Sequence, residues 1–370
     1  MYTNMSVTVL VDLLSYTGKK GGTDTYIRKL YSHISQLGLQ WKFHGIASRE
    51  ARNLNTTWFP GEITYSKLSG DIKLHWALGE IFSVSNFARK LKPQIIHCPA
   101  NFGPIISKYP VVVTLHDALY WSNPELAPNR MLLPGVKFMQ KVATDNASRI
   151  ITDSKASSVE LIKSLKISER KITVIYLGTP FTSNEVKSKW KEKEAGYILA
   201  GGNRFSHKNW ENLLKAIQLI DKKSRPNFII TGGRYPDPLT NLVKEYGLQN
   251  YVRLLGWVSE EEMNNLYINA RAVIIPSLVE GFSLPALQAM AYEKPLLASK
   301  IPVHLEIAEG VAYFFEPNSA QLIADSILEF VNDPRKVSKK LKLGLQRSKG
   351  FTWDECAKQT IGVMTSLLDE

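Results

Sequence analysis

The segment SLVEGFSLPALQAMAYEKP, residues 277–295, places a single carboxylate, Glu280, directly before a run with helical spacing. Pro285 suits the first turn of a helix, because proline has no amide hydrogen to leave unpaired there. The backbone amides from Gly281 to Leu284 are then expected at the helix start, where the dipole favours anions and hydroxyl oxygens. A carboxylate beside these donors suits a polyhydroxylated ligand, and Gln288 is expected to reach a further hydroxyl; a plain helix cap is the structural alternative for Glu280.

Two cations follow a predicted strand in the segment LAGGNRFSHKNWENLLKAI. Arg204 and Lys208 are four residues apart, and a guanidinium fork together with an ammonium group suits a diphosphate. A solvated helix face is the structural alternative for both side chains. We expect them to balance the charge of a phosphorylated ligand.

Gly21 and Gly22 stand directly before a helical pattern over Thr25–Leu37. Two glycines allow the backbone to approach phosphate oxygens or an acceptor closely, and a helix start favours anions. A plain strand-to-helix loop is the structural alternative.

His116 follows a β-branched run, Val111–Leu115, and is expected at the sheet edge where open α/β folds bind their ligands. A lone histidine is more often structural than functional, so both interpretations stay open. Asp117 is expected either to orient His116 or to cap the turn that follows.

The elements that position these residues are short apolar runs alternating with helical patterns. In the first half of the chain, the predicted helices are Thr25–Leu37 and Ser157–Leu165. The predicted strands are Val7–Leu13, Gln40–Ile46, Ile95–His97, Val111–Leu115, Arg149–Thr152 and Ile172–Ile175. Such alternation is typical of a parallel sheet covered on both faces.

After a charged passage, residues 177–196, the same alternation begins again. The predicted strands are Tyr197–Ala200, Asn227–Thr231, Val252–Leu255, Ala272–Ile275, Pro295–Ala298 and Ala312–Phe314. The predicted helices are Trp210–Ile220, Pro238–Tyr246, Glu260–Ile268, Leu284–Tyr292 and Ser319–Val331.

The pattern therefore predicts an α/β protein with two doubly wound, Rossmann-like domains, residues 1–180 and 181–351, that face a central cleft. The last segment, residues 352–370, has the spacing of an amphipathic helix that Thr352 can cap. The pattern of this helix does not show which domain it packs against, and the first domain is one possibility.

Positive charge is concentrated in the first half of the chain. Of the net charge of +12, residues 1–180 carry 22 Lys and Arg against 12 Asp and Glu, whereas residues 181–370 carry 24 against 22. A basic half can face nucleic acid, an anionic membrane surface or a phosphorylated ligand. Because zinc-finger spacing and RNA-binding signatures are absent from the sequence, we expect no nucleic-acid partner.

Composition and patterning predict a cytoplasmic protein. The chain is 44% apolar and opens without a signal-like segment, and no apolar run approaches the roughly 20 residues that span a bilayer. The two cysteines, Cys98 and Cys356, have neither metal-ligand nor redox spacing, which favours a reducing compartment. Residues 129–149 mix apolar and basic side chains, so they form either an ordinary packed helix or one that rests peripherally on an anionic membrane surface.

Five windows of the sequence resemble segments of glycosyltransferase family 4 and follow one another in the family's order. Residues 276–299, PSLVEGFSLPALQAMAYEKPLLAS, are similar to the family segment in which two Glu, with seven residues between them, bracket Gly-Phe-Gly-Leu-Pro. The other four windows are GKKGGTDTYIRKL, VVTLHDALYWSNPE, LAGGNRFSHKNWENLLKAI and FTWDECAKQTI. Together they span nearly the whole chain.

The resemblance implies the GT-B fold and transfer of a sugar from a nucleotide diphosphate donor with retained anomeric configuration. It implies no metal and no other cofactor, and the sequence contains no Asp-any-Asp triplet to hold a divalent cation between phosphates. The expected catalytic residues are His116, Arg204, Lys208 and Glu280. The expected donor-binding residues are Gly21, Gly22, Asn203, Val258, Gly281, Phe282, Ser283, Leu284 and Gln288. Val258, together with the adjacent Trp257, is expected near the nucleotide base.

Three positions depart from the family pattern. Asn203 separates Arg204 from the preceding glycine, and Ser283 replaces a glycine. Gln288 stands where relatives usually have Glu, so the side chain keeps one acceptor, loses the charge and gains two donors. We predict that Gln288 still contacts the ribose.

We expect a retaining, metal-independent glycosyltransferase that acts in the synthesis of a cell-surface polysaccharide or glycolipid. The second domain is expected to bind the nucleotide diphosphate sugar, and the basic first domain a saccharide or lipid-linked acceptor. A nucleotide-sugar epimerase of similar architecture and a non-catalytic partner subunit that binds sugar nucleotides are the alternatives. The sequence does not specify the nucleotide, the sugar or the acceptor.

Overall fold

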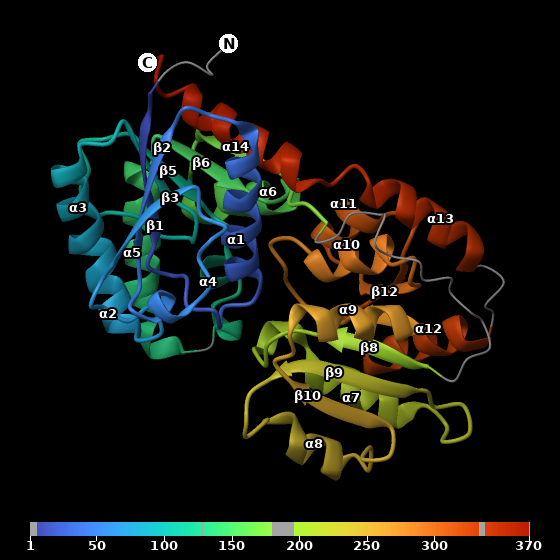
Figure 1. Cartoon of the computed structure of the whole chain (residues 1–370). Helices are drawn as coiled ribbons and strands as arrows, with labels where there is room; N and C mark the ends of the chain where they lie inside the picture. Colours follow the sequence, from blue (N-terminus) through green and yellow to red (C-terminus); the bar gives the residue numbers. More distant parts are fainter. Residues whose placement is uncertain (1–5, 128, 180–195, 333–336, 370) are drawn as a thin grey trace. The chain divides into compact units, whose positions relative to one another are not determined.

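The structure is a computed structural model that describes residues 6–127, 129–179, 196–332 and 337–369. The chain divides into two compact units. The first consists of Met1–Glu125, Asn129–Gly178 and Thr352–Glu370, and the second of Leu126–Pro128 and Thr179–Phe351. Each unit has a sheet with helices on both sides (Figure 1).

The sheet of the first unit has seven parallel strands in the order β3-β2-β1-β4-β5-β6-β7. Strand β1 is central and pairs with β2 in a continuous register from Thr8 opposite Lys42 to Leu13 opposite Ala47. The strands are β1 (Thr8–Leu13), β2 (Lys42–Ala47), β3 (Gly61–Tyr65), β4 (Ile95–Cys98), β5 (Val111–Thr114), β6 (Arg149–Thr152) and β7 (Ile172–Val174).

Helices cover both faces of this sheet, so strands β4 and β5 are buried along their whole length. The α-helices of the unit are α1 (Gly22–Ile34), α2 (Lys73–Leu78), α3 (Val84–Leu91), α4 (Leu119–Ser122), α5 (Leu133–Asn146), α6 (Lys155–Leu165) and α14 (Trp353–Thr365).

The sheet of the second unit has six parallel strands in the order β10-β9-β8-β11-β12-β13. They are β8 (Tyr197–Gly201), β9 (Asn227–Gly233), β10 (Val252–Gly256), β11 (Ala272–Ile275), β12 (Leu296–Ser299) and β13 (Tyr313–Phe315). The helices are α7 (Trp210–Leu219), α8 (Leu239–Glu245), α9 (Glu260–Asn269), α10 (Leu284–Ala291), α11 (Pro302–Ala308), α12 (Ala320–Asn332) and α13 (Val337–Ser348).

The predicted fold class, two parallel-sheet α/β domains, is confirmed, and every predicted strand is present to within two residues. Strand β3 was not predicted. It lies at the edge of its sheet with every residue exposed or half-buried, so its sequence GEITY has no apolar run that would mark a strand. The predicted helix Thr25–Leu37 begins three residues earlier, at Gly22.

Helix α5 occupies most of residues 129–149, for which the sequence allowed either an ordinary packed helix or a helix on the membrane surface. It buries Gln140, Ala143 and Thr144, which are small or polar residues. Phe138 is 62% exposed, and Met131, just before the helix, is 90% exposed. The helix thus packs on its unit through small, polar and half-buried apolar residues and leaves Phe138 exposed. The membrane interpretation stays a prediction.

Helix α14 packs against α1 and belongs to the first unit, which the sequence pattern left open. Trp353 at its start is buried, and its ring centroid lies 6.2 Å from that of Tyr26 in α1. The Thr352 side chain accepts a hydrogen bond of 3.2 Å from the backbone amide of Glu355, as the sequence predicted.

Replacement of Thr352 by alanine should lower the free energy of unfolding by about 1 kcal/mol, because an amide at the helix start loses its acceptor. Urea unfolding followed by circular dichroism measures the change. Thr352→Ser keeps the acceptor and should unfold close to the wild type. Equal stability of the alanine and wild-type proteins would contradict the proposed cap.

Candidate active site

Two loops of the second unit meet at the carboxyl edge of its sheet. Strands β8 and β11 are parallel neighbours, so the segments that follow them leave the sheet side by side. The amide of Leu278 donates to the carbonyl of His207 at 2.7 Å, and Asn209 Nδ2 donates to the carbonyl of Pro276 at 3.0 Å. These bonds hold the loops together over a sequence separation of about 70 residues.

Lys208 and Glu280 form a nearly buried ion pair between these loops. Lys208 Nζ lies 2.6 Å from Glu280 Oε1, and the two side chains are 14% and 11% exposed. The hydroxyl of Ser277 donates to the same oxygen at 2.6 Å, so Oε1 is not available to cap helix α10. Within the described part of the chain, Glu280 Oε2 and two N–H groups of Lys208 have no hydrogen-bond partner. These atoms can still bind a ligand.

The charge of Glu280 is maintained by its neighbours. Burial raises the pKa of this carboxyl, but Lys208, His207 and His304 outweigh the effect and leave the pKa below its ordinary value of 4.5. Glu280 is therefore ionised at neutral pH, as a group that accepts hydrogen bonds from sugar hydroxyls must be.

Arg204 is held by one carboxylate and two backbone carbonyls of the second unit. Its Nε and Nη2 donate to the carboxylate of Asp237 at 2.8–3.1 Å, and Nη1 donates to the carbonyls of Gly202 and Thr231 at 3.0 and 2.7 Å. A Cβ on Gly233 would lie 2.0 Å from Asp237 Oδ2, so the ion pair packs directly on a glycine. A role of Arg204 in diphosphate binding stays a prediction.

The start of helix α10 presents the predicted small-residue turn. The helix begins at Leu284 with Pro285 in its first turn, and no side chain of the preceding residue caps it. Ser283 is fully buried, and its hydroxyl has no partner among the described residues. Phe282 is also buried, with its ring centroid 6.2 Å from that of Phe351. Gly281 is half-buried beside Glu280.

Gln288 is already engaged through its only acceptor. The hydroxyl of Tyr267 donates to Gln288 Oε1 at 2.8 Å, and the Tyr267 ring stacks on Tyr292 at 5.2 Å. The amide nitrogen of Gln288 has no partner within the described residues. Gln288 can therefore offer a ligand two hydrogen-bond donors from its amide nitrogen, where a glutamate would offer only acceptors. Its contact with a ribose stays a prediction.

The remaining predicted donor residues lie after strands β8 and β10. Asn203 Oδ1 accepts from the amide of Phe205 at 3.2 Å, and its carbonyl accepts from Trp210 Nε1 at 2.7 Å. Trp257 directly follows β10 and is 48% exposed, whereas Val258 is half-buried. The two residues lie after an edge strand, away from the central β8. A base pocket here stays a prediction.

In the first unit, His116 follows β5 and is fixed at both ring nitrogens. Nδ1 lies 2.7 Å from Asp153 Oδ2, and Nε2 lies 3.1 Å from the carbonyl of Pro99. Burial lowers the pKa of His116, but the Asp153 carboxylate outweighs it and leaves the pKa above its ordinary value. An imidazolium that donates from both nitrogens satisfies this arrangement. Asp117 accepts from the amide of Leu119 and caps the following turn, one of its two predicted roles.

Gly21 precedes α1 with a positive φ of 56°, a conformation that favours glycine. A Cβ added to Gly22 would meet no atom within 4 Å, so this glycine is open to its surroundings. The contact of either glycine with a donor stays a prediction.

Sequence analysis missed several partners of the predicted residues. They are Asp153 beside His116, Ser277 beside Glu280, Asp237 beside Arg204 and Tyr267 beside Gln288. His304 is a further missed residue, because its charge helps to lower the pKa of Glu280. His304 is fully buried, and its Nε2 has no partner among the described residues. For Asp153 a signal was present, because it directly follows strand β6, the neighbour of β5.

A buried acidic pair in the first unit was also not predicted. Burial, and then the Asp12 charge, raise the pKa of Glu80 well above its ordinary value. Lys20 lies nearby with its ammonium 4.0 Å from the ring centroid of Trp76, and burial lowers its pKa. Trp76 Nε1 donates to Glu80 Oε1 at 2.8 Å. The loop before α1 is thereby anchored on charged and aromatic groups.

Comparison with known proteins places the chain in a family. Residues 20–181 match the model described as Glycosyltransferase Family 4, and residues 182–344 match Glycosyl transferases group 1. O-antigen chain mannosyltransferase B of Escherichia coli is 30% identical over 288 residues, which cover 74% of each chain. The chain belongs to glycosyltransferase family 4.

Solved structures support the GT-B fold of this glycosyltransferase. Sucrose-phosphate synthase from Thermosynechococcus elongatus superposes with a TM-score of 0.79 at 17% identity, over 98% of this chain and 99% of its own. Anabaena HepE in complex with UDP-glucose has a TM-score of 0.75 at 20% identity, over 97% and 100%. Both likenesses establish the fold.

The described residues of this glycosyltransferase contain neither a membrane-spanning helix nor a group of metal ligands. None of its described helices is long and apolar enough to cross a bilayer. In the same part of the chain, no three His, Cys, Asp or Glu side chains are grouped as a metal site requires. Metal independence stays a prediction.

Replacement of Lys208 by methionine should lower the free energy of unfolding by about 3 kcal/mol at pH 7, because Glu280 is left nearly buried without its cation. The depressed pKa of Glu280 stabilises the fold above pH 4.5, and this contribution is lost as the pH falls through the folded-state pKa. The difference between the two proteins should therefore shrink in acid. Urea unfolding at pH 7 and pH 4 measures it.

Lys215→Met removes a cation from an exposed pair with Glu211 and serves as the control, with little expected change. The double variant Lys208→Met/Glu280→Gln should regain much of the lost stability, because no buried charge is left unpaired. A Lys208→Met penalty that does not change with pH would refute the ion-pair account.

Proposed function

We propose that the protein is a retaining glycosyltransferase that moves a sugar from a nucleotide diphosphate to an acceptor hydroxyl. The second unit binds the donor, and the more basic first unit binds a saccharide or lipid-linked acceptor. The observation that carries the proposal is the Lys208–Glu280 pair, which keeps a carboxylate oxygen and ammonium hydrogens open at the carboxyl edge of a Rossmann-like sheet. Ligands of open α/β sheets bind at this edge.

The two charges suit the two parts of the donor. The ammonium of Lys208 stabilises negative charge that grows on the diphosphate as the bond to the anomeric carbon breaks. The ionised Glu280 accepts hydrogen bonds from hydroxyls of the transferred sugar and orients the ring. In a retaining transfer, the acceptor oxygen bonds to the anomeric carbon on the face that the diphosphate leaves. The acceptor proton passes to an oxygen of the departing diphosphate.

The relatives suggest a biological setting. The E. coli relative is named for the O-antigen chain, and Anabaena HepE was solved with UDP-glucose. We therefore propose that the protein transfers a hexose during the synthesis of a cell-surface polysaccharide, on the cytoplasmic side of the membrane.

We further propose that no metal is needed, so EDTA should leave the rate of transfer unchanged.

Lys208→Ala should reduce kcat by about 10²–10³-fold, equivalent to about 2.7–4 kcal/mol of barrier, with a smaller change in KM. The assay follows the release of nucleoside diphosphate from UDP-glucose and GDP-mannose across a panel of saccharide and lipid-linked acceptors. Lys215→Ala, an exposed lysine of helix α7, is the control and should retain the wild-type rate.

Two results would count against the proposal. An unchanged kcat in the folded Lys208→Ala protein would remove Lys208 from the reaction. A covalent adduct of sugar with Glu280 would assign this residue to nucleophilic attack instead of hydroxyl binding.

A further inference from the structure

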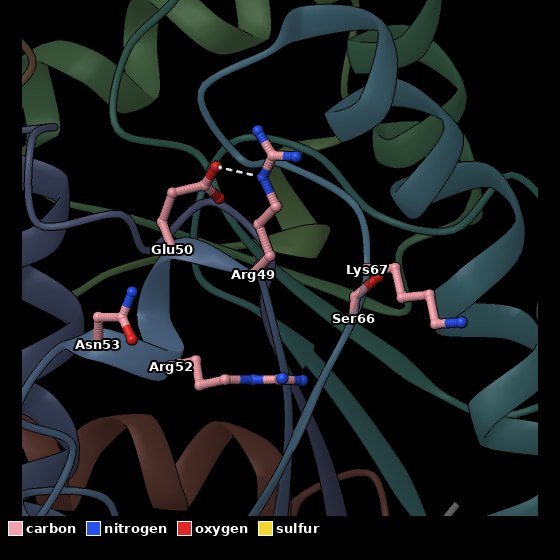
Figure 2. Close-up of a pocket in the computed structure, with 6 residues that line it drawn as sticks. All are labelled: Arg49, Glu50, Arg52, Asn53, Ser66 and Lys67. Atoms are coloured by element: carbon pink, nitrogen blue, oxygen red, sulfur yellow. Dashed lines mark hydrogen bonds and ion pairs between the residues drawn. The ribbon is translucent and has the colours of Figure 1, made fainter.

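A basic hollow of the first unit has no part in the site described above. It is an open depression of ≈ 400 Å³ that is lined by Arg49, Glu50, Arg52, Asn53, Ser66 and Lys67. Figure 2 shows that the first four come from the segment after β2 and the last two from the segment after β3. A volume of this size is in the range of small-molecule sites and exceeds what one phosphate fills.

The only carboxylate that lines the hollow is already committed to the protein. Glu50 Oε1 accepts from Ser69 Oγ at 2.6 Å and from Arg49 Nε at 3.0 Å, and Oε2 accepts from the amide of Gly70 at 3.0 Å. Burial of the Glu50 carboxyl raises its pKa, but these hydrogen bonds outweigh that effect and lower the pKa to about 2. Glu50 therefore holds Arg49 in place from one edge and leaves both terminal nitrogens of the guanidinium for another acceptor.

The other two cations have no counter-charge. Among the described residues, no carboxylate lies within ion-pair distance of Arg52 or Lys67. The Arg52 guanidinium lies 5.8 Å from the ring centroid of Tyr65, whose hydroxyl is 3.2 Å from Thr56 Oγ1. The aromatic ring thus orients Arg52 without neutralising it. Three cations thus line the hollow, and in the described part of the chain only Arg49 among them has an ion-pair partner, so the lining carries a net positive charge.

The position of the hollow suits a ligand of the same sheet. Arg49 and Lys67 follow the carboxyl ends of parallel strands β2 and β3, the edge where open α/β sheets bind ligands. His116 follows β5 at the same edge, and three strand spacings separate β2 from β5. At about 4.8 Å each, these spacings amount to about 14 Å, the length of a short oligosaccharide or of a sugar joined to a diphosphate.

We propose that this hollow binds a phosphate group carried by the acceptor. Guanidinium groups bind phosphate oxygens in pairs, and Lys67 adds a point charge. The proposal rests on the assignment of acceptor binding to the first unit. The phosphate belongs either to a soluble sugar phosphate or to a lipid headgroup, two sources with the same recognition chemistry.

The test compares the full-length protein with Arg52→Gln/Lys67→Gln. Arg49 is kept, because its loss would leave Glu50 without its cation. Lys90→Gln/Lys163→Gln is the matched control, since it removes the same charge from exposed lysines of helices α3 and α6 in the same unit. Calorimetry measures binding of glucose 6-phosphate, with glucose as the neutral comparison. Sedimentation with phosphatidylglycerol vesicles measures binding of a lipid headgroup.

We expect the wild type and the control to bind at least one phosphate probe, and the hollow variant to bind it about tenfold or more weakly. Binding of glucose 6-phosphate assigns a soluble source, and binding of the vesicles alone assigns a lipid. Equal losses in the hollow variant and the control, or no binding of either probe by the wild type, would overturn the proposal.

Titration of UDP-glucose and GDP-mannose into the same proteins separates this inference from the proposed function. A protein that binds a nucleotide sugar but neither phosphate probe refutes the hollow alone. A protein that binds a phosphate probe through Arg52 and Lys67 but binds no nucleotide sugar refutes the proposed donor site alone.

Discussion

The ion pair between Lys208 and Glu280 is the interaction on which the second unit's candidate site depends. Removing a carboxylate from water costs several kcal/mol unless a cation and hydrogen bonds compensate. Here one oxygen receives both Lys208 and Ser277, while the other oxygen stays open. The same contact joins the loops after two neighbouring strands. The stability of these loops and the proposed binding of the donor therefore involve the same two charges.

The sequence indicated these charges but not their contact. Strand periodicity located β8 and β11, and the residues that follow them were selected because the carboxyl edge of a parallel sheet binds ligands. That Lys208 and Glu280 meet depends on strand order, since β11 pairs directly with β8 although two strands lie between them in sequence. Local periodicity carries no information on this order. The resemblance to family 4 supplied it indirectly, through the implied fold.

Partners set by side-chain packing were beyond reach of the sequence. Asp237 captures Arg204, and Tyr267 takes the acceptor of Gln288, from segments 33 and 21 residues away. Each pairing follows from how a loop or helix folds over the sheet, which short-range spacing does not encode. The edge strand β3 was missed for a different reason, because its mostly exposed residues lack an apolar run. The basic hollow beside it consequently escaped sequence analysis as well.

We propose that a nucleotide sugar lies on the open atoms of the Lys208–Glu280 pair. A crystal structure of the protein with the donor that binds most tightly tests it most directly. We expect Lys208 Nζ about 2.8 Å from a diphosphate oxygen and Glu280 Oε2 hydrogen-bonded to a hydroxyl of the sugar. A donor that is well ordered in the second unit but contacts neither Lys208 nor Glu280 would contradict the account.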